Sequence, residues 1–409
     1  MSQEKINSTA AENSDKLSRR RFVVGAGAAA LAFTVVKPAL VRGAQANSKI
    51  NLGLIGCGGR GTWIASLFKQ HGGYNIVAVS DYFGDRADSA GDNLGVDKAN
   101  RFTGLSGYRK LIEKVDAVAI ETPPYFHPEQ AAAAVDAGKH VYLAKPIAVD
   151  TPGCLSIGDS GKKATAKKLA FLVDFQSRAN EFFKGAVQWV HDGNIGKVVL
   201  IQANYFTGPI GRSVGDKSPE ARLRGWTSDI AFSGDIIVEQ NIHALDIATW
   251  FLGADPIKAA GTGGNTLHCH NGDCYDHFAV LFYCPNDIVI DFSSTQCTQG
   301  LDDIGVRVFA QTGTADVHYG GRVFIRGQKS YAGGNTGPIF QEGCVQNIKD
   351  FYKNITEGNF ANETVAPSVR SNLTCVLGRE AAYKKAPVTW DEMLKEARKV
   401  DPKLEGLKA

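Results

Sequence analysis

Short apolar runs alternate with helix-like stretches along the first half of the chain. The runs that predict buried strands are Ile50–Ile55, Tyr74–Ser80, Asp116–Glu121, His140–Leu143 and Leu169–Asp174. Hydrophobic residues recur at helical spacing in Thr62–Gln70, Pro128–Ala137 and Pro152–Lys168 between them. This alternation predicts an α/β fold with a doubly wound parallel sheet.

The pattern changes after about residue 195, where strand-like runs follow one another closely. These runs are Val198–Tyr205, Ile257–Thr262, Phe278–Tyr283, Ile288–Ser294, Val306–Gln311 and Ala315–Tyr319. Helical patterns at Gln240–Leu252, Gln346–Ile355 and Ser368–Lys384 interrupt or close the series. We expect a second, α+β domain on an open, mainly antiparallel sheet, whose face could support a homo-oligomer.

The N-terminal 46 residues have the composition of an export signal. Ser18-Arg19-Arg20-Arg21-Phe22-Val23 is a twin-arginine pattern, and the apolar run Val23–Val36 is too short to span a bilayer comfortably. Ala44-Gln45-Ala46 offers a small-residue cleavage site. We expect the twin-arginine machinery to export the protein to the periplasm, with cleavage near Ala46 and no stable membrane span afterwards. An uncleaved anchor and a chance pair of arginines are the alternatives.

Positive charge is concentrated in this signal. The whole chain has a formal net charge of +3, and residues 1–46 hold seven Lys or Arg against three Asp or Glu, a surplus of +4. Subtraction leaves the remainder near −1. Because no broad basic field remains, we do not expect nucleic acid as the main partner.

The eight cysteines do not form a dense disulfide scaffold in a chain of 409 residues. One pair stands out, because Asn271-Gly272 predicts a hairpin turn that places Cys269 opposite Cys274. Cα atoms about 4.5 Å apart at such a position lie within disulfide range. His268, His270 and His277 share this stretch, but their spacing fits no standard zinc pattern, so we expect no metal. Two unpaired thiols are the alternative to the disulfide.

A glycine-rich turn follows the first predicted strand. Gly56-Cys57-Gly58-Gly59-Arg60-Gly61 matches G-x-G-x-x-G, opens a helix and is followed by Asp81 at the end of the next strand. Gly56 permits the turn, Gly58 lets the backbone approach a pyrophosphate, and Gly61 permits close packing of helix against strand. Amide groups at the helix N-terminus then bind the anion. The motif, including Gly59 and Arg60, predicts a Rossmann domain that binds a dinucleotide.

Asp81 favours NAD over NADP, because a carboxylate accepts hydrogen bonds from ribose hydroxyls and repels a 2′-phosphate. Arg60 or Arg86 would soften this preference, which leaves NADP open. We therefore divide the chain into an export signal (1–46), an NAD-binding Rossmann domain (47–174), a substrate-binding α+β domain (175–385) and a polar, solvated C-terminal tail (386–409).

Further motifs occur in a specific order along the chain. They are Thr122-Pro123-Pro124-Tyr125-Phe126-His127, Ala137–Val141, Lys145-Pro146, Gly193–Lys197 and Glu239–His243. This series resembles the Gfo/Idh/MocA family of glucose–fructose oxidoreductases and inositol dehydrogenases over roughly residues 50 to 385. The resemblance implies that the cofactor contacts include Thr122, Pro123, His127, Lys145 and Pro146.

The resemblance also implies that Lys145 and His243 carry the chemistry. Alcohol oxidation needs a base for the hydroxyl proton, which suits histidine, and a nearby ammonium stabilises the developing alkoxide. On a helix over residues 239–251, Glu239, His243 and Asp246 would share one face, so that a carboxylate orients the imidazole. A surface lysine, a packed histidine and a structural aspartate are the alternative interpretations.

Two departures from the family pattern affect this site. Ala144 replaces the glutamate of the E-K-P motif, and Glu239 stands where aspartate is usual. They leave open whether net dehydrogenation is the final reaction. Arg178 and Asp246 are weaker candidates for the substrate cleft, and Trp226 is either a platform for sugar stacking or a core residue.

We predict an exported oxidoreductase that acts on a hydroxyl group of a sugar, glycoside or cyclic polyol by hydride transfer. Because free NAD is scarce outside the cytoplasm, the cofactor would stay tightly bound and be restored by a second substrate. The alternative is a redox-neutral, NAD-dependent glycosidase or lyase, which oxidises, eliminates and returns the hydride. A sugar-binding protein without catalysis is a third hypothesis, against which Lys145 and His243 argue.

Overall fold

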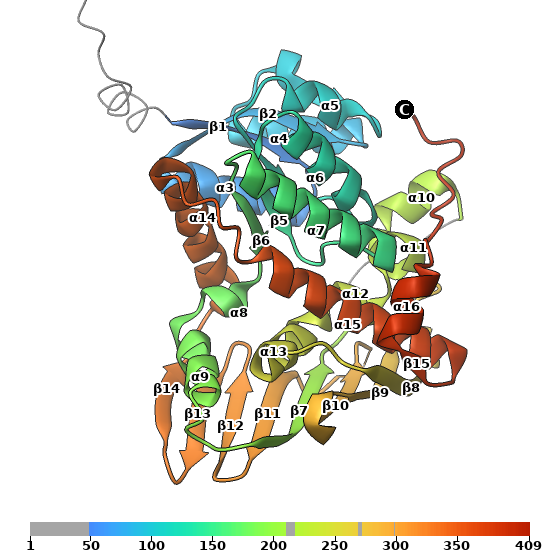
Figure 1. Cartoon of the computed structure of the whole chain (residues 1–409). Coiled ribbons are helices and arrows are strands. Elements are labelled where there is room, and N and C mark those ends of the chain that lie inside the picture. Colours follow the sequence, from blue (N-terminus) through green and yellow to red (C-terminus); the bar gives the residue numbers. More distant parts are fainter. Residues whose placement is uncertain (1–48, 210–216, 269–271, 298) are drawn as a thin grey trace, which may run out of the picture. The chain divides into compact units, whose positions relative to one another are not determined.

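The computed structural model describes residues 49–409 apart from 210–216, 269–271 and 298. The predicted export signal, Cys269 and His270 therefore lie outside the described residues. The described elements form two sheets with helices between and beside them (Figure 1).

The first sheet has six parallel strands in the order β3-β2-β1-β4-β5-β6. They are β1 (Ile50–Ile55), β2 (Tyr74–Asp81), β3 (Arg101–Thr103), β4 (Ala117–Ile120), β5 (His140–Ala144) and β6 (Phe171–Asp174). Helices α3 (Gly59–His71), α4 (Gly84–Leu94), α5 (Gly107–Ile112), α6 (His127–Asp136) and α7 (Thr151–Ala166) connect them. The doubly wound prediction is confirmed, although the three-residue β3 was too short for its pattern to be recognised.

Both faces of this sheet are buried. In β4, Ala117 and Ala119 belong to one hydrophobic cluster, whereas Val118 and Ile120 belong to another. Alternate residues of a strand point to opposite faces, so a helical layer covers each face. The strand order reverses between β1 and β4, and ligands of such sheets bind beside the carboxyl ends of the strands at this point.

The second sheet has nine strands in the order β14-β13-β12-β11-β7-β10-β9-β8-β15. They are β7 (Val198–Phe206), β8 (Lys258–Gly264), β9 (His277–Tyr283), β10 (Val289–Thr295), β11 (Asp303–Ala310), β12 (Gly313–His318), β13 (Arg322–Gly327), β14 (Tyr331–Asn335) and β15 (Val388–Thr389). Only β7 and β10 pair in parallel within this described sheet, so the mainly antiparallel prediction is confirmed. The sequence pattern missed β14, which has two glycines among its five residues.

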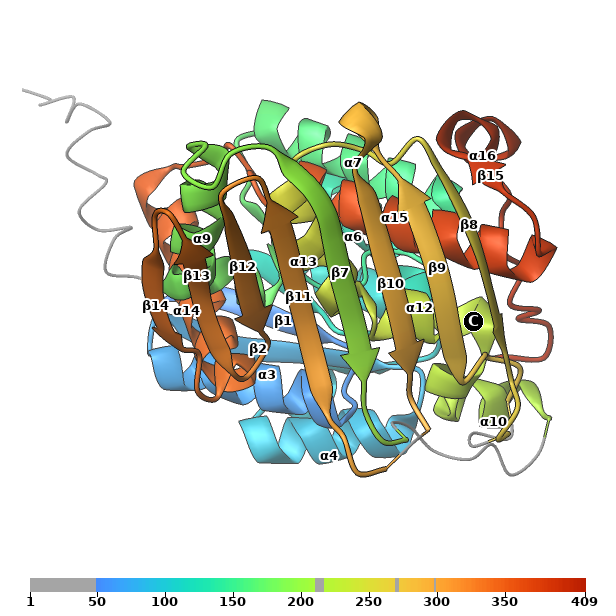
Figure 2. The same cartoon turned by 90° about the horizontal axis from the view of Figure 1, so that it is seen from below.

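Helices cover one face of the nine-stranded sheet, and Figure 2 shows the other face toward the viewer. The helices that follow β6 along the chain are α8 (Gln176–Ala179), α9 (Glu181–His191), α10 (Pro219–Arg224), α11 (Ile230–Ser233), α12 (Ile236–Glu239), α13 (Ile242–Leu252), α14 (Ile339–Glu357), α15 (Val365–Lys384) and α16 (Trp390–Glu396). Of these, α14 packs against the core of the first sheet. In β9, Phe278, Val280 and Phe282 are buried, whereas Leu281 and Tyr283 are exposed on the open face. A homo-oligomer formed through this face stays a prediction.

The connection between β8 and β9 differs from the predicted hairpin. Gly264 pairs directly with His277, so residues 265–276 form a long connection in which no described residue belongs to a strand. Cys274 is a buried free thiol, so the predicted disulfide between Cys269 and Cys274 is wrong. Cys297 is disulfide-bonded instead. Tertiary contact overrides the local turn preference, because the Asp273 amide donates a hydrogen bond to the Ser228 carbonyl.

The prediction of a solvated C-terminal tail is wrong for several residues. Val388 and Met393 are buried, and Val388 pairs with β8. The end of the chain returns to the Rossmann sheet (Figure 1), where the Leu105 amide donates to the Lys408 carbonyl at 3.1 Å. Leu404 and Leu407 pack against the cluster around Phe83. A few apolar residues thus pack this segment against the rest of the protein. They were overlooked in the sequence because most of their neighbours are polar.

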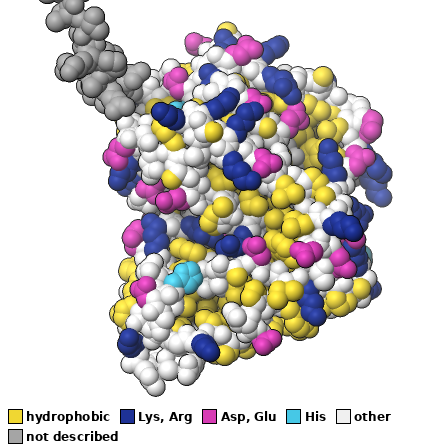
Figure 3. Space-filling model, viewed as in Figure 1, with side chains coloured by type: hydrophobic (Ala, Val, Ile, Leu, Met, Phe, Trp, Pro, Cys, Tyr) yellow, Lys and Arg dark blue, Asp and Glu magenta, His cyan; other side chains and the backbone are white. Residues whose placement is uncertain are grey.

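Charged side chains of both signs are interspersed on the face that Figure 3 shows. In the part of the chain that the structure describes, no helix is both long enough and apolar enough to cross a membrane.

The contact of α3 with the glycine turn allows a direct test of the fold. A Cβ at Gly61 would lie 1.9 Å from the Gly56 carbonyl oxygen, whereas a Cβ at Gly59 would meet no heavy atom within 4 Å. We expect Gly61→Ala to lower the free energy of unfolding by about 2 kcal/mol or more, because the backbone must move. The control Gly59→Ala, in the same helix, should change it by less than about 1 kcal/mol. Thermal denaturation of dinucleotide-free protein measures both, and equal midpoints would contradict the packing.

Candidate active site

The glycine turn leaves open space at the N-terminus of α3. Gly56 has a φ of +96°, which favours glycine. A Cβ at Gly58 or Gly59 would meet nothing within 4 Å, and no side chain caps the amides of the first turn of α3. Free amides beside an open space form an anion site, so this turn fits the pyrophosphate of a dinucleotide. The turn at Gly56 and the close packing at Gly61 are as the sequence predicted, whereas contacts of Gly58 and Gly59 with a cofactor stay predictions.

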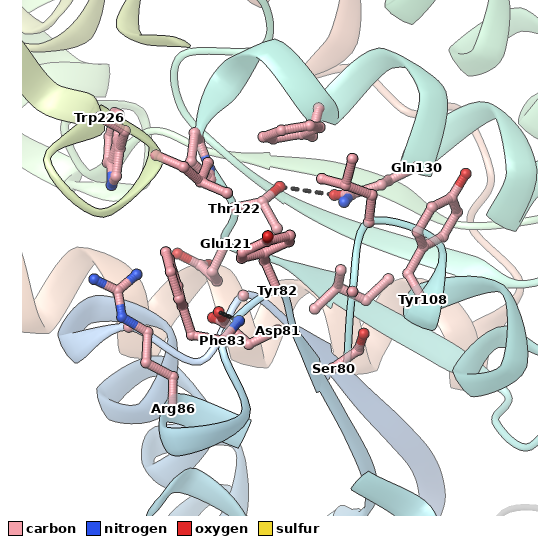
Figure 4. A pocket seen from close by; sticks show the side chains of 18 residues that line it. Ser80, Asp81, Tyr82, Phe83, Arg86, Tyr108, Glu121, Thr122, Gln130 and Trp226 are labelled. Atoms are coloured by element: carbon pink, nitrogen blue, oxygen red, sulfur yellow. Dashed lines mark hydrogen bonds between the residues drawn. The ribbon is translucent and has the colours of Figure 1, made fainter. Parts of the chain in front are cut away.

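A first cavity extends from this turn along the carboxyl ends of β1, β2 and β4 (Figure 4). Its lining comprises Ile55, Gly56, Gly58, Ser80, Asp81, Tyr82, Phe83, Arg86, Gly104, Leu105, Tyr108, Glu121, Thr122, Pro123, Phe126, Gln130, Leu223 and Trp226. The set combines apolar walls with a few polar groups, as small-molecule sites do. Its position at the reversal of strand order suits the adenosine half of a dinucleotide.

Asp81 is held at the edge of this cavity by two backbone amides. Its carboxylate accepts hydrogen bonds from the Cys57 amide at 2.7 Å and the Phe83 amide at 2.9 Å. Burial raises the pKa of Asp81, and these hydrogen bonds oppose the rise. Arg86 lines the same cavity, whereas Arg60 does not. Only Arg86 could therefore soften the preference for NAD, and that role of Arg60 is wrong.

A second cavity, of about 290 Å³, adjoins the first. It is lined by Arg60, Glu121, Thr122, Pro124, Ala144, Lys145, Pro146, Tyr205, Trp226, Glu239, Gln240, His243, Ile304, Tyr319 and Phe340. Glu121, Thr122 and Trp226 line both cavities and mark their junction. The structure thus brings Lys145, from the end of β5, and His243, from α13, into one site. The volume is near the lower end of the range for small-molecule sites.

The surroundings of Lys145 and His243, the two proposed catalytic residues, change the pKa values of both side chains. Lys145 Nζ donates a hydrogen bond to the Glu239 carbonyl oxygen at 2.8 Å. Burial lowers the pKa of Lys145, and the Glu239 carboxylate opposes this change. Burial and the positive charges of Lys145 and Arg60 lower the pKa of His243 well below its usual range. His243 Nδ1 has no hydrogen-bond partner among the described residues. A neutral imidazole beside an ammonium can accept a proton from a bound hydroxyl group.

Glu239 does not orient the imidazole, contrary to our expectation. A turn at Gln240 and Asn241 separates two helices, so α12 ends at Glu239 and α13 begins at Ile242. The Glu239 side chain accepts a hydrogen bond from Gln240, and its backbone carbonyl receives Lys145. Glu239 and His243 therefore lie on two different helices, and the four-residue spacing does not place them on a common face. Glu239 positions the lysine rather than the histidine.

Arg178 and Asp246 are not part of either cavity. They form a double hydrogen bond with each other at 2.9 to 3.0 Å, and Ser371 also donates to Asp246 at 2.6 Å. Arg178 further lies over the ring of Trp250. This pair joins α8, α13 and α15, so the substrate role that we considered for both residues is wrong.

Trp226 has one of the two positions that we considered, whereas His127 does not lie where we expected. Trp226 is only partly buried and lines both cavities, so it is not a core residue. His127 is buried, with Nδ1 2.8 Å from the Pro146 carbonyl oxygen and Nε2 2.8 Å from the Thr122 carbonyl oxygen. Burial lowers the pKa of His127 to about 4, and a neutral imidazole donates from only one nitrogen. The single N–H of His127 thus donates to one of these two carbonyls, and the ring lies between the Thr122 and Pro146 segments instead of facing the cofactor.

A cluster of three charged residues at the second cavity was not predicted from the sequence. Arg60 Nη2 lies 2.6 Å from Asp174 Oδ2, and its Nε lies 3.2 Å from Glu121 Oε2. Glu121 follows β4, and Asp174 ends β6. Both carboxylates stand at carboxyl ends of parallel strands, where ligands of such sheets bind. The strand pattern of the sequence was sufficient to predict that both carboxylates lie at this edge of the sheet.

Two parts of the chain match models of the same protein family. Residues 50–170 match the family described as "Oxidoreductase family, NAD-binding Rossmann fold", and residues 183–316 match the "GFO/IDH/MocA C-terminal domain". An inositol 2-dehydrogenase of Rhizobium meliloti is 23% identical over 345 residues, which cover 82% of this chain and 96% of the relative. An inositol 2-dehydrogenase of Klebsiella pneumoniae is 28% identical over 65% of this chain and 73% of its own length.

Solved structures share this fold. The myo-inositol 2-dehydrogenase of Lactobacillus plantarum aligns with a TM-score of 0.67 at 21% identity, over 84% of this chain and 99% of that one. A levoglucosan dehydrogenase in complex with NADH and L-sorbose aligns with a TM-score of 0.69 at 19% identity, over 84% and 100%. With the two domain matches and the site geometry, the chain belongs to the Gfo/Idh/MocA family of oxidoreductases, with an NAD-binding Rossmann domain.

Proposed function

We propose that this protein is an NAD-dependent dehydrogenase that oxidises a hydroxyl-bearing carbon of a sugar, glycoside or cyclic polyol. The supporting observation is that Lys145 and His243 line one cavity that shares three residues with the dinucleotide cavity. The names of the relatives support the substrate class, since they are inositol and levoglucosan dehydrogenases.

The roles of the two residues follow from their surroundings. His243, kept neutral by burial, accepts the hydroxyl proton of the substrate. Lys145, held by the Glu239 carbonyl, stabilises negative charge on the same oxygen. Gly56, Gly58 and the other residues of the first cavity would hold NAD, which would supply the acceptor for the hydride that the carbon loses as it becomes a carbonyl carbon. Trp226, at the junction of the cavities, provides an aromatic wall for the ring of the substrate.

We also propose that the protein acts after export through the twin-arginine route and keeps its cofactor bound. The disulfide at Cys297 supports an oxidising compartment, because such bonds are rare in the cytosol. The C-terminal segment supports retention, since Leu404 and Leu407 pack beside Phe83, a residue of the dinucleotide cavity. A retained cofactor needs a second substrate to restore its oxidation state.

Protein purified without added cofactor should contain dinucleotide. We expect denaturation to release about one NAD(H) per chain, because the cofactor that enters before export is held by both cavities. Mass spectrometry and absorbance at the nicotinamide band measure the amount and distinguish NAD from NADP. A preparation without nicotinamide that also fails to bind added NAD would contradict the proposal.

Removal of either catalytic group should lower turnover while binding persists. We expect His243→Ala and Lys145→Met each to reduce the rate of polyol or sugar oxidation by about 10²- to 10⁴-fold, the usual contribution of a general base or of an oxyanion donor. Bound dinucleotide is measured in parallel. His191→Ala, on the exposed end of α9, is the control and should retain full activity. Full activity of the His243 variant would refute its role as the base.

Aryl glycosides separate the dehydrogenase from the redox-neutral alternative. We expect oxidation of polyol or sugar hydroxyls, with reduction of the bound cofactor and no release of the aryl group. Steady release of the aryl group without net reduction of the cofactor would contradict this and establish the glycosidase or lyase reaction. Absorbance of a nitrophenolate leaving group measures the release.

A further inference from the structure

A buried carboxyl group without a hydrogen-bond donor stands where the two cavities meet. Glu121 lines both of them, and its side chain is 0% exposed. Neither of its carboxylate oxygens has a hydrogen-bond partner among the described residues. Arg60 Nε lies 3.2 Å from Oε2, close enough for an ion pair but not aligned as a hydrogen bond. Because an unsatisfied buried carboxyl group is costly, a ligand is expected to supply the missing contact.

Arg60 has a second carboxylate partner besides Glu121. The closer partner of Arg60 is Asp174, at 2.6 Å, and Asp174 also accepts hydrogen bonds from Gln176 at 3.0 Å and Asn347 at 2.8 Å. Arg60 and Asp174 thus form a well-connected neutral pair, and Asp174 lines neither cavity. Glu121 adds a second carboxyl group to this cluster, and it lines both cavities where they meet.

The junction determines which part of the cofactor Glu121 meets. A dinucleotide with its pyrophosphate at Gly58 and its adenosine beside Asp81 must pass Glu121, Thr122 and Trp226 to reach Lys145 and His243. The part that passes this point is the nicotinamide riboside. Its ring carries a positive charge when oxidised and none when reduced.

We propose that Glu121 contacts the nicotinamide end of the bound dinucleotide and stabilises the oxidised form relative to the reduced form. This inference rests on the proposed binding of NAD. A carboxylate in a water-excluded site attracts the cationic ring and has no such attraction for the neutral one. The bound reduced cofactor is then a stronger hydride donor, which suits an enzyme that must restore its own cofactor with a second substrate.

The test compares the affinities of dinucleotide-depleted protein for NAD⁺ and NADH, measured by NADH fluorescence and by competition. We expect Glu121→Gln, which keeps the size of the side chain, to shift the ratio of the two affinities toward NADH by about tenfold or more. Glu357→Gln is the matched control, because Glu357 is an exposed residue paired with Lys353 on α14, outside both cavities. Its ratio should equal that of the wild type.

Each outcome separates this inference from the proposed function. If the Gln variant binds both forms with the wild-type ratio, the role of Glu121 is refuted although NAD binding stands. If the wild-type protein binds neither form, the proposed function itself fails. If the Gln variant does not fold, Glu121→Asp decides, because it retains the charge. Its ratio should stay within about threefold of the wild type, and a tenfold shift toward NADH would overturn the proposal.

Discussion

The close approach of α3 to the backbone at Gly56 determines the position of the whole site. Position 61 has room for hydrogen alone, since a Cβ would lie 1.9 Å from the Gly56 carbonyl oxygen. This contact places the N-terminus of α3 against the end of β1, with uncapped amides facing the crevice. It also directs Arg60 toward Glu121 and Asp174, at the ends of β4 and β6. The anion site and the charged cluster therefore share one structural cause.

Burial then gives the charged groups their chemical character. His243, Lys145 and Glu121 are all removed from water, which disfavours their charged forms. For Glu121, burial raises the pKa to about 7, against the attraction of Arg60. Neighbouring charges act strongly in such a site because little water screens them. A neutral base, a lysine fixed through a backbone carbonyl and an unsatisfied carboxyl group are a combination suited to hydride chemistry.

The elements that the sequence predicted best are those with strong local patterns. Buried strands such as β1 and β5 have apolar runs, and the G-x-G-x-x-G turn has steric requirements that glycine alone meets. The meeting of Lys145 with His243 followed from a family resemblance, and the structure places both in one cavity. The Cys269–Cys274 pairing failed because contacts distant in sequence hold that loop.

Other parts of the site could not be read from spacing. The break between α12 and α13 redirects Glu239, and the partner of Arg178 is Asp246 because three helices meet there. Glu121 escaped notice because it does not belong to the motif that contains Thr122 and His127. In the strand register, Ile120 pairs with Leu143, so Glu121 lies beside Ala144, the position at which the family's E-K-P glutamate is absent.

The glycine turn and the side chains of Lys145 and His243 are expected to lie along one bound dinucleotide. A crystal structure of the purified protein with its own dinucleotide tests this most directly. We expect pyrophosphate density against the amides at Gly58 and Gly59 and the nicotinamide ring in the cavity that Lys145 and His243 line. A nicotinamide ring outside that cavity, in a protein that still turns over substrate, would contradict it.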